Sequence, residues 1–260
     1  MNFSHFVSKP NLSIKNEGET EEIHNTLKMS LIEDWDISFE AGVDEYGEDI
    51  AIDESTGDIY VVGYNGTVGV DYDVLLIKYN SDGDQQWNVT WDNGGNEYGY
   101  GVAVDSQSYV YVAGSNGTTY PTFDVLLLKF NSSGEQEWFR TWDSGDYDAG
   151  WGLKIDSQDN LYIAGQTKAS QGDLLLLKYD SSGLYKWNST FGGTNGQHGY
   201  DLAIDSSNNI YIAGLTITAS QDLLLVKFNS SGFHVWNRTW GGTDHDYGWG
   251  VALDSGNSVY

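Results

Sequence analysis

The sequence of 260 residues has no cysteine, contains only two prolines and is poor in basic residues. Without cysteine the chain forms no disulfide, offers no thiolate to a metal ion and has no cysteine nucleophile. Twelve Lys and Arg stand against 38 Asp and Glu, which gives a net charge of −26. Such a surface repels nucleic-acid phosphates and anionic membranes. We therefore expect no nucleic-acid partner, whereas cationic ligands and metal ions stay open.

Arginine is also scarce, since it occurs only as Arg140 and Arg238. A sialidase needs an arginine cluster for the carboxylate of its substrate, so that enzyme is excluded. The five histidines show no spacing typical of a metal site. No nucleophile elbow of the form G-x-S-x-G occurs either. The sequence therefore predicts no catalytic residues.

Long apolar stretches are missing as well. No window reaches the ~18 apolar residues of a membrane-spanning helix. Residues 1–33 lack both the basic start and the unbroken apolar core of a signal peptide. We predict no membrane span and interpret residues 1–33 as a flexible N-terminal leader.

Glycine, by contrast, is abundant, with 32 residues, and the sequence repeats itself. A short apolar run that ends in aspartate, such as GVAVD or DLAID, recurs five times, at intervals of 52, 51, 49 and 49 residues. The five aspartates are Asp53, Asp105, Asp156, Asp205 and Asp254. Each is followed by a polar turn and a run such as VYVAG, which the fifth copy leaves incomplete. In the first four repeats a leucine-rich run such as DVLLLKF and a run such as WNRTW come next.

Each repeat thus offers four short β-type runs separated by turns rich in Gly, Asn, Ser and Asp. A period near 50 residues with four strands is typical of a β-propeller blade. We predict an all-β propeller over residues 34–260, with a partial blade at each end. The four full blades are expected at about residues 47–92, 99–143, 150–192 and 199–241. The partial blades are expected at 34–40, as a lone fourth strand, and at 248–260, and we expect the sequence to be truncated.

The leucine-rich run is continuous where many strands alternate, as in DLLLLKY from Asp173. A strand that is covered on each face by a neighbouring blade loses the alternation. The fourth strand carries two large rings four residues apart, such as Trp87 and Trp91, which therefore share a face. We interpret these rings as packing between blades, with sugar stacking as the alternative.

The pattern GYGVAVDSQSYVYVAG, followed by DVLLLKFNSSGEQEW, resembles the repeat of the SBBP-type proteins, a family named after a seven-bladed β-propeller. The likeness covers about residues 34–260. The family tends to occur in large secreted or surface proteins of bacteria and archaea. The resemblance implies a propeller fold and a surface binding or scaffolding role, and no catalytic residues. The chain departs from the family in its blade number and in having no visible export signal.

In a propeller, the links between blades and the loops between second and third strands emerge at one end, which we call the loop face. Just before each first strand stands an acidic residue, or Gln197 in one repeat, two positions ahead of a repeated glycine. An aromatic residue follows that glycine in four repeats, and the aspartates that open the third strands approach from the same end. The candidate ligand-binding residues are Glu45, Glu97, Asp148, Asp246, Tyr100, Trp151, Tyr200, Trp249, Asp73, Asp124, Asp173 and Asp222.

Acidic and aromatic groups that converge on the mouth of a channel suit a cation, a basic peptide or a glycan. The alternative is structural. In that case the repeated glycine adopts a special backbone angle, the ring covers the edge of the blade, and the acids are solvated.

The aspartates that end the first strands form a second ring. Aspartate before Ser, Gly or Asn caps a turn through its carboxylate. Calcium is the alternative, although no D-x-D-x-D-G loop occurs and NSDGD from Asn80 is the nearest approach. We predict turn capping and no cofactor. Lys154, which replaces an alanine of the other repeats, is either an ion-pairing residue of the channel or a neutral variation.

Asparagine sequons are frequent, and several fall on or just before the fourth strand, where glycans would project outward. The candidate glycosylation sites are Asn65, Asn88, Asn116, Asn131, Asn188, Asn229 and Asn237. Together with the acidity and the lack of cysteine, they favour an extracellular or cell-surface location.

These features predict a non-catalytic propeller that binds a protein or glycan ligand at the loop face. A rigid ring holds the variable loops, so that little ordering entropy is lost on binding. Two alternatives stay open. One is a propeller hydrolase or lyase that uses carboxylates at the channel mouth, by analogy of fold. The other is a structural repeat module of a larger surface protein, whose partners are further blades of a longer chain.

Overall fold

The computed structural model describes residues 11–13, 30–32, 44–67, 71–118, 122–167 and 172–260. The chain divides into two compact units, Met1–Glu40 and Ala41–Tyr260. In the first unit, β1 (Asn11–Ser13) pairs antiparallel with β2 (Ser30–Ile32). The second unit contains four antiparallel sheets. The described part of the chain has no helix, and hence none long and apolar enough to cross a membrane.

Each of the four sheets is built from four consecutive strands joined by hairpins. The first sheet consists of β3 (Asp44–Ile52), β4 (Ile59–Thr67), β5 (Asp71–Tyr79) and β6 (Gln85–Trp91). The second consists of β7 (Asn96–Val104), β8 (Val110–Gly117), β9 (Asp124–Phe130) and β10 (Gln136–Trp142). The third consists of β11 (Asp148–Ile155), β12 (Leu161–Thr167), β13 (Asp173–Tyr179) and β14 (Tyr185–Phe191). The fourth consists of β15 (Gln197–Ile204), β16 (Ile210–Ile217), β17 (Gln221–Phe228) and β18 (His234–Trp240).

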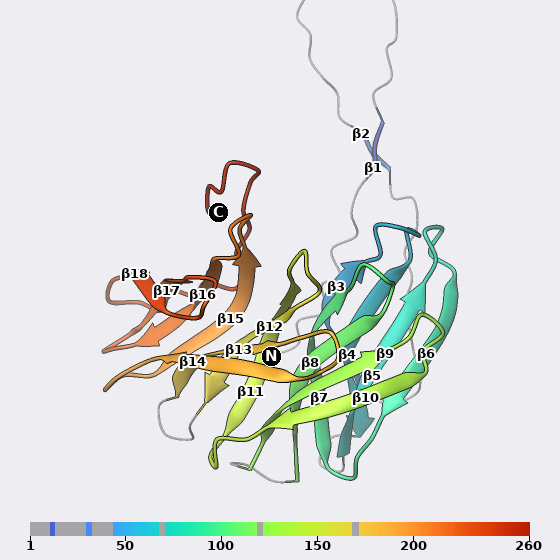
Figure 1. Ribbon diagram of the computed structural model, residues 1–260, viewed down its shortest axis with the longest axis horizontal. Coiled ribbons are helices and arrows are strands. Elements are labelled where there is room, and N and C mark those ends of the chain that lie inside the picture. The colour runs from blue at the N-terminus through green and yellow to red at the C-terminus, as the bar shows by residue number, and fades with distance from the viewer. Residues whose placement is uncertain (1–10, 14–29, 33–43, 68–70, 119–121, 168–171) are drawn as a thin grey trace, which may run out of the picture. The chain divides into compact units, whose positions relative to one another are not determined.

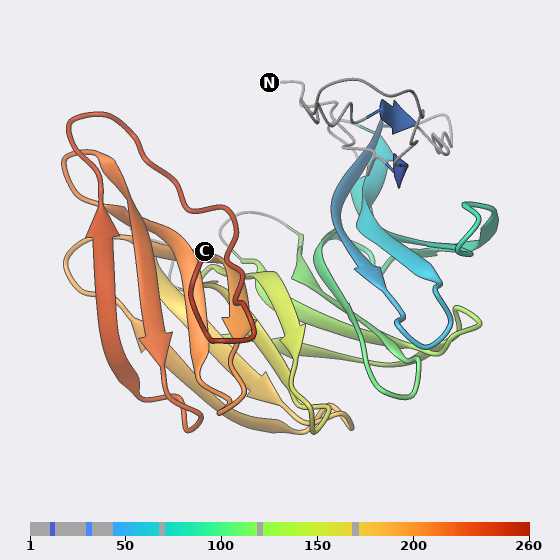
Figure 2. The same cartoon turned by 90° about the horizontal axis from the view of Figure 1, so that it is seen from above.

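Consecutive sheets pack face to face, and the first strand of each sheet makes most of the contact. Strand β7 contacts β3, β4 and β5 of the preceding sheet, while β11 contacts β7, β8 and β9, and β15 contacts β11, β12 and β13. Figures 1 and 2 show the four sheets following one another in chain order. Four-stranded antiparallel sheets that pack in this way are the blades of a β-propeller, as the repeat predicts.

The leucine-rich third strand is buried on both faces. In β9, Leu126 packs in one cluster with Val74 of the preceding sheet. Its neighbour Leu127 points the other way and packs with Leu175 of the following sheet. Each such side chain contributes about 1.5–3 kcal/mol through its removal from water. The continuous apolar run is therefore confirmed as a strand between two neighbouring sheets.

The paired rings of the fourth strand pack between sheets, as expected. Trp91 belongs to the cluster between the first and second sheets, and its indole N–H donates to the Gln136 side chain at 2.9 Å. Trp138 and Trp142 pack against the cluster between the second and third sheets. Trp240 of the fourth sheet, in contrast, is 69% exposed. The packing role is thus met in the sheets that have a following neighbour.

Each first strand carries a β-bulge opposite a glycine of the second strand. In the third sheet, Trp151 is the extra residue, between Gly150 and Gly152. The two strands approach so closely there that a Cβ on Gly165 would lie 1.9 Å from the carbonyl oxygen of Ala149. The same contact recurs at Gly63, Gly114 and Gly214. The glycine that ends each VYVAG-like run is therefore required inside the sheet, and the bulge redirects the extra side chain.

The repeated glycine just before the bulge is also explained by packing. The expected special backbone angle is wrong, because Gly99, Gly150 and Gly199 are not among the residues with positive φ. Instead, a Cβ on Gly99 would lie 2.8 Å from the carbonyl oxygen of Gly63 in the preceding sheet. Close approach of neighbouring sheets, rather than backbone conformation, excludes a side chain at this position.

The sequence also predicts a partial blade at each end of the repeats. The expected strand over 34–40 lies outside the described residues. The first strand of the first sheet is more exposed than that of the second sheet: Ile50 is 55% exposed, whereas its counterpart Val102 is 2% exposed. At the other end, Leu253 and Val259 form an antiparallel bridge, with two hydrogen bonds between Ala252 and Tyr260. The last residues thus form a hairpin at the position where first and second strands stand in the four sheets.

Candidate functional site

Two sets of loops meet at the loop face, as the repeat predicts. The backbone N–H of Asp148, in the link between the second and third sheets, donates to the Phe123 carbonyl at 2.7 Å. In the same way, the N–H of Gln197 at the start of the fourth sheet donates at 3.0 Å to the carbonyl of Gly172, which precedes the third strand of the third sheet. Each link is therefore tied to the loop that precedes the third strand of the sheet before it.

Side chains from the bulges form a continuous strip of rings, which we call the aromatic strip. The ring centroids of Trp151 and Tyr200 are 5.2 Å apart, and Tyr200 stacks on Trp249 at 4.7 Å. His198 lies 5.7 Å from Trp151, and Tyr247 lies 5.6 Å from Trp249. Trp249 is 68% exposed. The structure thus brings three of the predicted aromatic residues together.

A second group, the tyrosine patch, consists of Tyr46, Tyr64, Tyr72, Tyr98 and Tyr100. Tyr64 is central, with ring centroids 4.9 Å from both Tyr46 and Tyr98. Tyr72 lies 5.5 Å from Tyr64 and from Tyr98, and Tyr100 stacks on Tyr98 at 5.8 Å. Tyr46 is 42% exposed and the others are partly buried. Of the five, only Tyr100 is a candidate from the sequence.

Two members of the predicted acidic column are buried. Glu97 and Asp148 have exposures of 1% and 0%, so the structural alternative, in which the acids are solvated, is wrong for both. They cap their own links: the N–H of Asn93 donates to Glu97 at 3.2 Å, and the N–H of Ser144 donates to Asp148 at 2.7 Å. Burial raises the pKa of both carboxyls, although these hydrogen bonds oppose the shift.

The remaining members of the column are less uniform. Glu45 and Asp246 are half-buried, and Gln197 is 7% exposed. The Gln197 amide donates to the Thr216 hydroxyl at 3.0 Å, a polar contact between neighbouring strands of one sheet. Gln197 therefore serves the local structure of its sheet.

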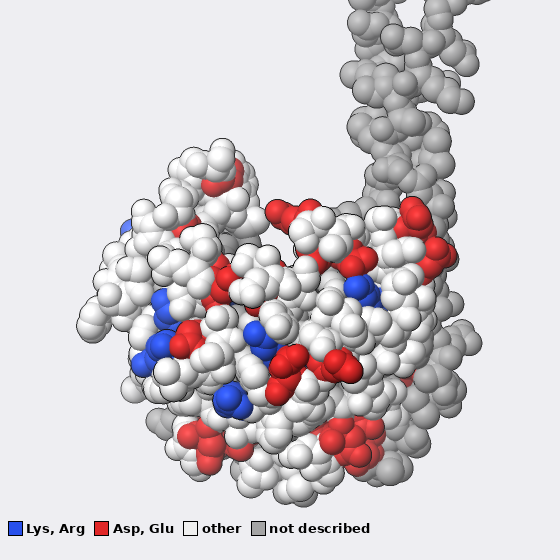
Figure 3. All heavy atoms as spheres, turned by 45° about the vertical axis from the view of Figure 1, so that its right-hand side comes forward, with Lys and Arg blue, Asp and Glu red and all other residues white. Residues whose placement is uncertain are grey.

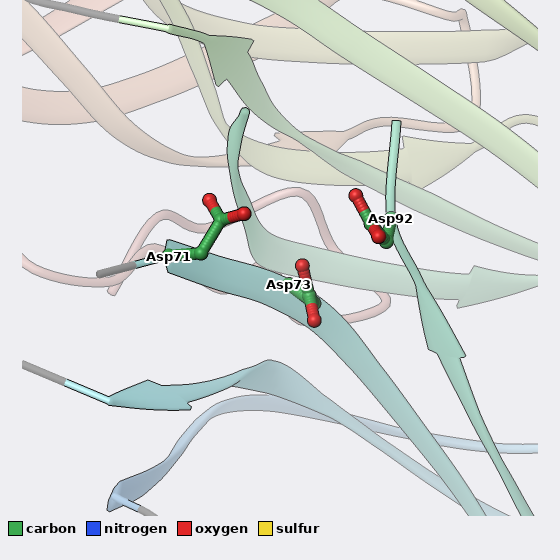
Figure 4. Close-up of side chains that lie close together, drawn as sticks. All are labelled: Asp71, Asp73 and Asp92. Carbon is green, nitrogen blue, oxygen red and sulfur yellow. The ribbon is translucent and has the colours of Figure 1, made fainter. Parts of the chain in front are cut away.

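Aspartates instead gather at the start of the third strands of the first two sheets. The first acidic cluster consists of Asp71, Asp73 and Asp92, whose nearest carboxylate oxygens lie within 4.8 Å of one another. Figure 4 shows Asp71 and Asp73 on β5 beside Asp92, which follows β6. Burial raises the pKa of Asp73, and the charges of Asp92 and Asp71 add to the shift. The cluster is therefore an unbalanced concentration of negative charge.

The second acidic cluster repeats this arrangement one sheet later, with Asp124, Asp143 and Asp148. Burial raises the pKa of Asp124, and the charges of Asp143 and Asp148 add to it. A cavity of about 210 Å³ opens beside this cluster, lined by Thr122, Asp124, Asp143, Gly145 and Asp146. Carboxylate oxygens of this kind could hold a hard cation. In Figure 3, acidic side chains gather in several patches on the face drawn, and basic side chains are fewer.

The third and fourth sheets lack such clusters, although their third strands open with aspartate too. The positions of Asp92 and Asp143 are taken by Gly192 and Gly241. A Cβ on Gly192 would lie 2.0 Å from a carboxylate oxygen of Asp173, so the carboxylate occupies that space. Asp222 accepts hydrogen bonds from Ser220 at 2.8 Å and Thr218 at 3.2 Å. No third group of three carboxylates this close occurs in the described ranges.

Lys154 forms an ion pair, which is the first of the two alternatives that the sequence leaves open. Its ammonium lies 3.6 Å from the carboxylate of Asp201 on β15, the first strand of the next sheet. The positive charge of Lys154 also acts on the carboxylate of Asp49 in the first sheet. Burial raises the pKa of Asp49, while the N–H of Val102 and the charge of Lys154 oppose the shift. Asp201 adds to the shift, so first strands of different sheets interact through these charges.

The opposite end of each sheet, where the first strand turns into the second, is the turn end. All five aspartates of the second ring cap this turn, which confirms the prediction. For Asp156, the donors are the backbone N–H groups of Gln158 and Asn160, at 2.9 and 3.0 Å. The Tyr162 hydroxyl donates to Asp156 at 3.1 Å and accepts from Lys178 at 2.5 Å. Burial alone would raise the pKa of Asp156, but the hydrogen bonds outweigh it and lower the pKa.

The sequons differ in accessibility. Asn88 and Asn188 on the fourth strands are exposed, and Asn237 is half-exposed. Asn131 and Asn229 use their side-chain oxygens to cap turns, each accepting from a serine N–H at 3.0 Å. The side-chain oxygens of Asn65 and Asn116 are buried. The geometry therefore suits a glycan best at the three fourth-strand positions.

Four rings of the tyrosine patch were missed by the sequence analysis. Tyr46 and Tyr98 each stand one residue after a member of the acidic column, and His198 and Tyr247 are their counterparts in other repeats. An alignment of the repeats therefore indicates a second aromatic column. Tyr64 lies on β4, where the other sheets have Ser115, Gln166 and Leu215. Tyr72 lies on β5, and Phe123 is its aromatic counterpart in the second sheet. Only the hairpin register that places Gly66 opposite Tyr72 brings them together.

Comparison with known proteins supports the fold alone. No protein-family model matches the chain, and no curated protein matches it in sequence. A protein of unknown function from Dyadobacter fermentans is similar in structure, with a TM-score of 0.61, 10% identity, and coverage of 83% of this chain and 74% of that one. The periplasmic gluconolactonase of Pseudomonas aeruginosa has a TM-score of 0.51 at 12% identity, over 75% of this chain and 57% of that one.

Proposed function

We propose that this chain is a non-catalytic binding module in which the propeller displays the loop face to a protein or glycan ligand. One observation carries the proposal: the loop face gathers partly exposed rings and uncompensated carboxylates that the packing of the sheets does not require. Aromatic side chains with one face in water are characteristic of binding surfaces. The turn end, in contrast, pairs its charged groups internally.

Unpaired acceptors support the same proposal. Within the described part of the chain, several buried side-chain oxygens at this end lack a hydrogen-bond partner. They are five of the seven such oxygens in the described residues and belong to Asn65, Asp73, Asn116, Gln166 and Gln197, while the other two, of Asp53 and Tyr60, lie at the turn end. Buried acceptors normally find a donor, so the larger number at the loop face supports a surface that receives donors from a partner.

The test is a screen of the full chain against a glycan array and a peptide panel, followed by matched variants. Tyr46→Ala and Trp249→Ala remove loop-face rings that are 42% and 68% exposed. Their controls, Tyr185→Ala and Phe233→Ala, remove rings that are 43% and 71% exposed elsewhere. We expect ligand binding to weaken in the first pair only. Binding that responds to the control pair, or to neither pair, contradicts the proposal.

Hydrolysis is the second candidate, favoured by the second acidic cluster and its cavity. A carboxyl group with a raised pKa beside an ionised one can divide the roles of acid and base. Turnover of a lactone or glycoside that is lost in Asp143→Asn, with unchanged thermal stability, supports this candidate over the first. No turnover across the panel removes it.

We also propose a location outside the cell or at its surface, and membership of a larger SBBP-type surface protein in which residues 248–260 begin a fifth blade. The exposed sequons Asn88, Asn188 and Asn237 support that location. Mass spectrometry of protein purified from its natural source tests it, because glycans are expected at these positions and not at Asn65 or Asn116.

A further inference from the structure

The tyrosine patch is the most concentrated aromatic surface of the loop face. Five phenol rings from two sheets touch one another there, and none of them belongs to the buried clusters between the sheets. Tyr46 stands at its edge with 42% of its surface exposed. Tyrosine offers a large, rigid contact area at low cost in conformational entropy, which is why it is enriched in binding surfaces.

Carboxylates border this patch on two sides. On one side, Glu48 accepts a hydrogen bond from the Tyr64 hydroxyl. On the other side lies the first acidic cluster. Burial and the neighbouring Tyr72 raise the pKa of Tyr98, and the charge of Asp71 adds to the shift, so the acid and the ring are close. The rings therefore lie in a negative potential.

Within the described residues, no ion pair joins a basic side chain to these groups. The five ion pairs found in the described ranges involve other carboxylates, at the turn end, in the turns between third and fourth strands and between first strands. Where the chain does place lysine over a tyrosine, the geometry is close: the Lys129 ammonium is 3.8 Å from the centroid of the Tyr109 ring. The tyrosine patch offers the same type of partner to a lysine from outside.

We infer that the tyrosine patch binds a basic segment of another polypeptide, with lysine or arginine stems on the tyrosine rings and their charged heads near Glu48 and the first acidic cluster. This inference rests on the proposed function and names its partner. Cation–π contact and opposite charge then act together. The net charge of −26 draws a cationic partner toward the surface and repels an anionic one.

Other occupants fit less of the surface. A neutral glycan would stack on the rings but leave the repulsion among Asp71, Asp73 and Asp92 in place. A metal ion would compensate those carboxylates but leave the five rings without a role. A basic peptide is the one partner that uses both features, since its side chains combine an apolar stem with a positive head.

The test is isothermal titration calorimetry of the full chain with a peptide of four Lys–Ala repeats. A Glu–Ala peptide, maltohexaose and calcium chloride are titrated alongside. We expect binding of the lysine peptide alone, weakening as salt is raised. Tyr46→Ala is expected to weaken it roughly three-fold, as for one exposed cation–π contact. Asp71→Asn is expected to weaken it to a similar degree and to reduce the salt dependence.

Matched variants make the result specific. Tyr185→Ala removes an equally exposed ring on β14, and Glu137→Gln removes an exposed carboxylate on β10. Both should bind like the parent chain. Tyr46→Phe keeps the ring face and should restore the affinity lost in Tyr46→Ala, which guards against misfolding as the cause.

Three outcomes overturn the inference. If Tyr46→Ala and Asp71→Asn leave the affinity for the lysine peptide unchanged, the peptide is held only by the overall negative charge of the chain. Calcium binding that is sensitive to Asp71→Asn, without peptide binding, makes the cluster a cation site. Maltohexaose binding that is sensitive to Tyr46→Ala overturns the partner class but leaves the proposed loop-face function standing, so the two claims fail separately.

Discussion

The turn end and the loop face of the same sheets use charge in opposite ways. At the turn end, Asp156 is held by backbone N–H groups, by Tyr162 and at longer range by Lys178, and the fourth sheet repeats the arrangement with Asp205, Tyr211 and Lys227. At the loop face, Asp73 and Asp124 lie among other carboxylates. A hydrogen-bonded network that repeats from sheet to sheet indicates a structural role, whereas unbalanced charge that appears in some repeats indicates a role toward a partner.

The largest expected effect sharpens the structural half of this comparison. Gly165→Ala would force a Cβ to within 1.9 Å of the Ala149 carbonyl oxygen, a contact that only separation of the strands can relieve. We expect a loss of about 3 kcal/mol or more in unfolding free energy. Gly193→Ala is the control, because nothing lies within 4 Å of its Cβ position. Urea unfolding of the two variants checks this; equal stability would contradict the assigned role of the bulge.

The stability of the folded chain is expected to depend on pH in opposite senses at the two ends. The pKa of Asp156 is lowered in the folded chain, because its hydrogen bonds outweigh its burial. Its stabilising contribution is present above the ordinary aspartate pKa of about 4 and is lost as the pH falls through the lower folded value. We expect Asp156→Asn to lose about 1–2 kcal/mol at neutral pH and to unfold with a weaker dependence on pH below 4.

Asp124 should behave in the opposite sense. Burial and the neighbouring carboxylates raise its folded pKa above the unfolded one. Its ionised form therefore costs stability at neutral pH, and this cost disappears as the pH falls through the folded pKa toward about 4. Asp124→Asn is expected to raise the melting temperature at pH 7 and to leave it unchanged at pH 4. Circular dichroism melts across this range test both variants, and parallel curves would refute the contrast between the two ends.

The smallest effect on stability is expected for the ion pair between first strands, which belongs to neither the loop face nor the turn end. Lys154 is partly exposed, so its pair with Asp201 at 3.6 Å is worth about 0.5–1 kcal/mol, and less in high salt. Lys154→Ala should lose that amount at low ionic strength. A variant as stable as the parent at every salt concentration would show that the pair contributes nothing to the packing of the sheets.

The sequence predicts the turn end well and the loop face in part. Repeated residues such as Asp105 and Leu126 have the same role in each sheet, so periodicity alone assigns them to turn and core. The same reasoning assigns the two sets of loops to one face. Each of these assignments follows from local rules that hold in every copy of the repeat.

The remainder depends on contacts that periodicity does not encode. The need for Gly165 comes from the bulge at Trp151, which is visible only in the register of two strands. The tyrosine patch joins residues of two sheets, and Tyr64 has no aromatic counterpart in the other three sheets. Whether an aspartate of the loop face accepts local hydrogen bonds, as Asp222 does, or lies in an acidic cluster, as Asp71 does, depends on distances of a few ångströms between separate loops.

Hydrogen exchange of the full chain with and without the lysine–alanine peptide tests the central claim most directly. We predict that the bound peptide slows exchange at the loop face of the first two sheets, within residues 44–49, 71–73 and 92–100. Exchange at the turn end, within residues 105–109 and 156–160, should not change. Protection that appears at the turn end, or is spread evenly over the four sheets, would contradict the claim that the loop face is the binding surface.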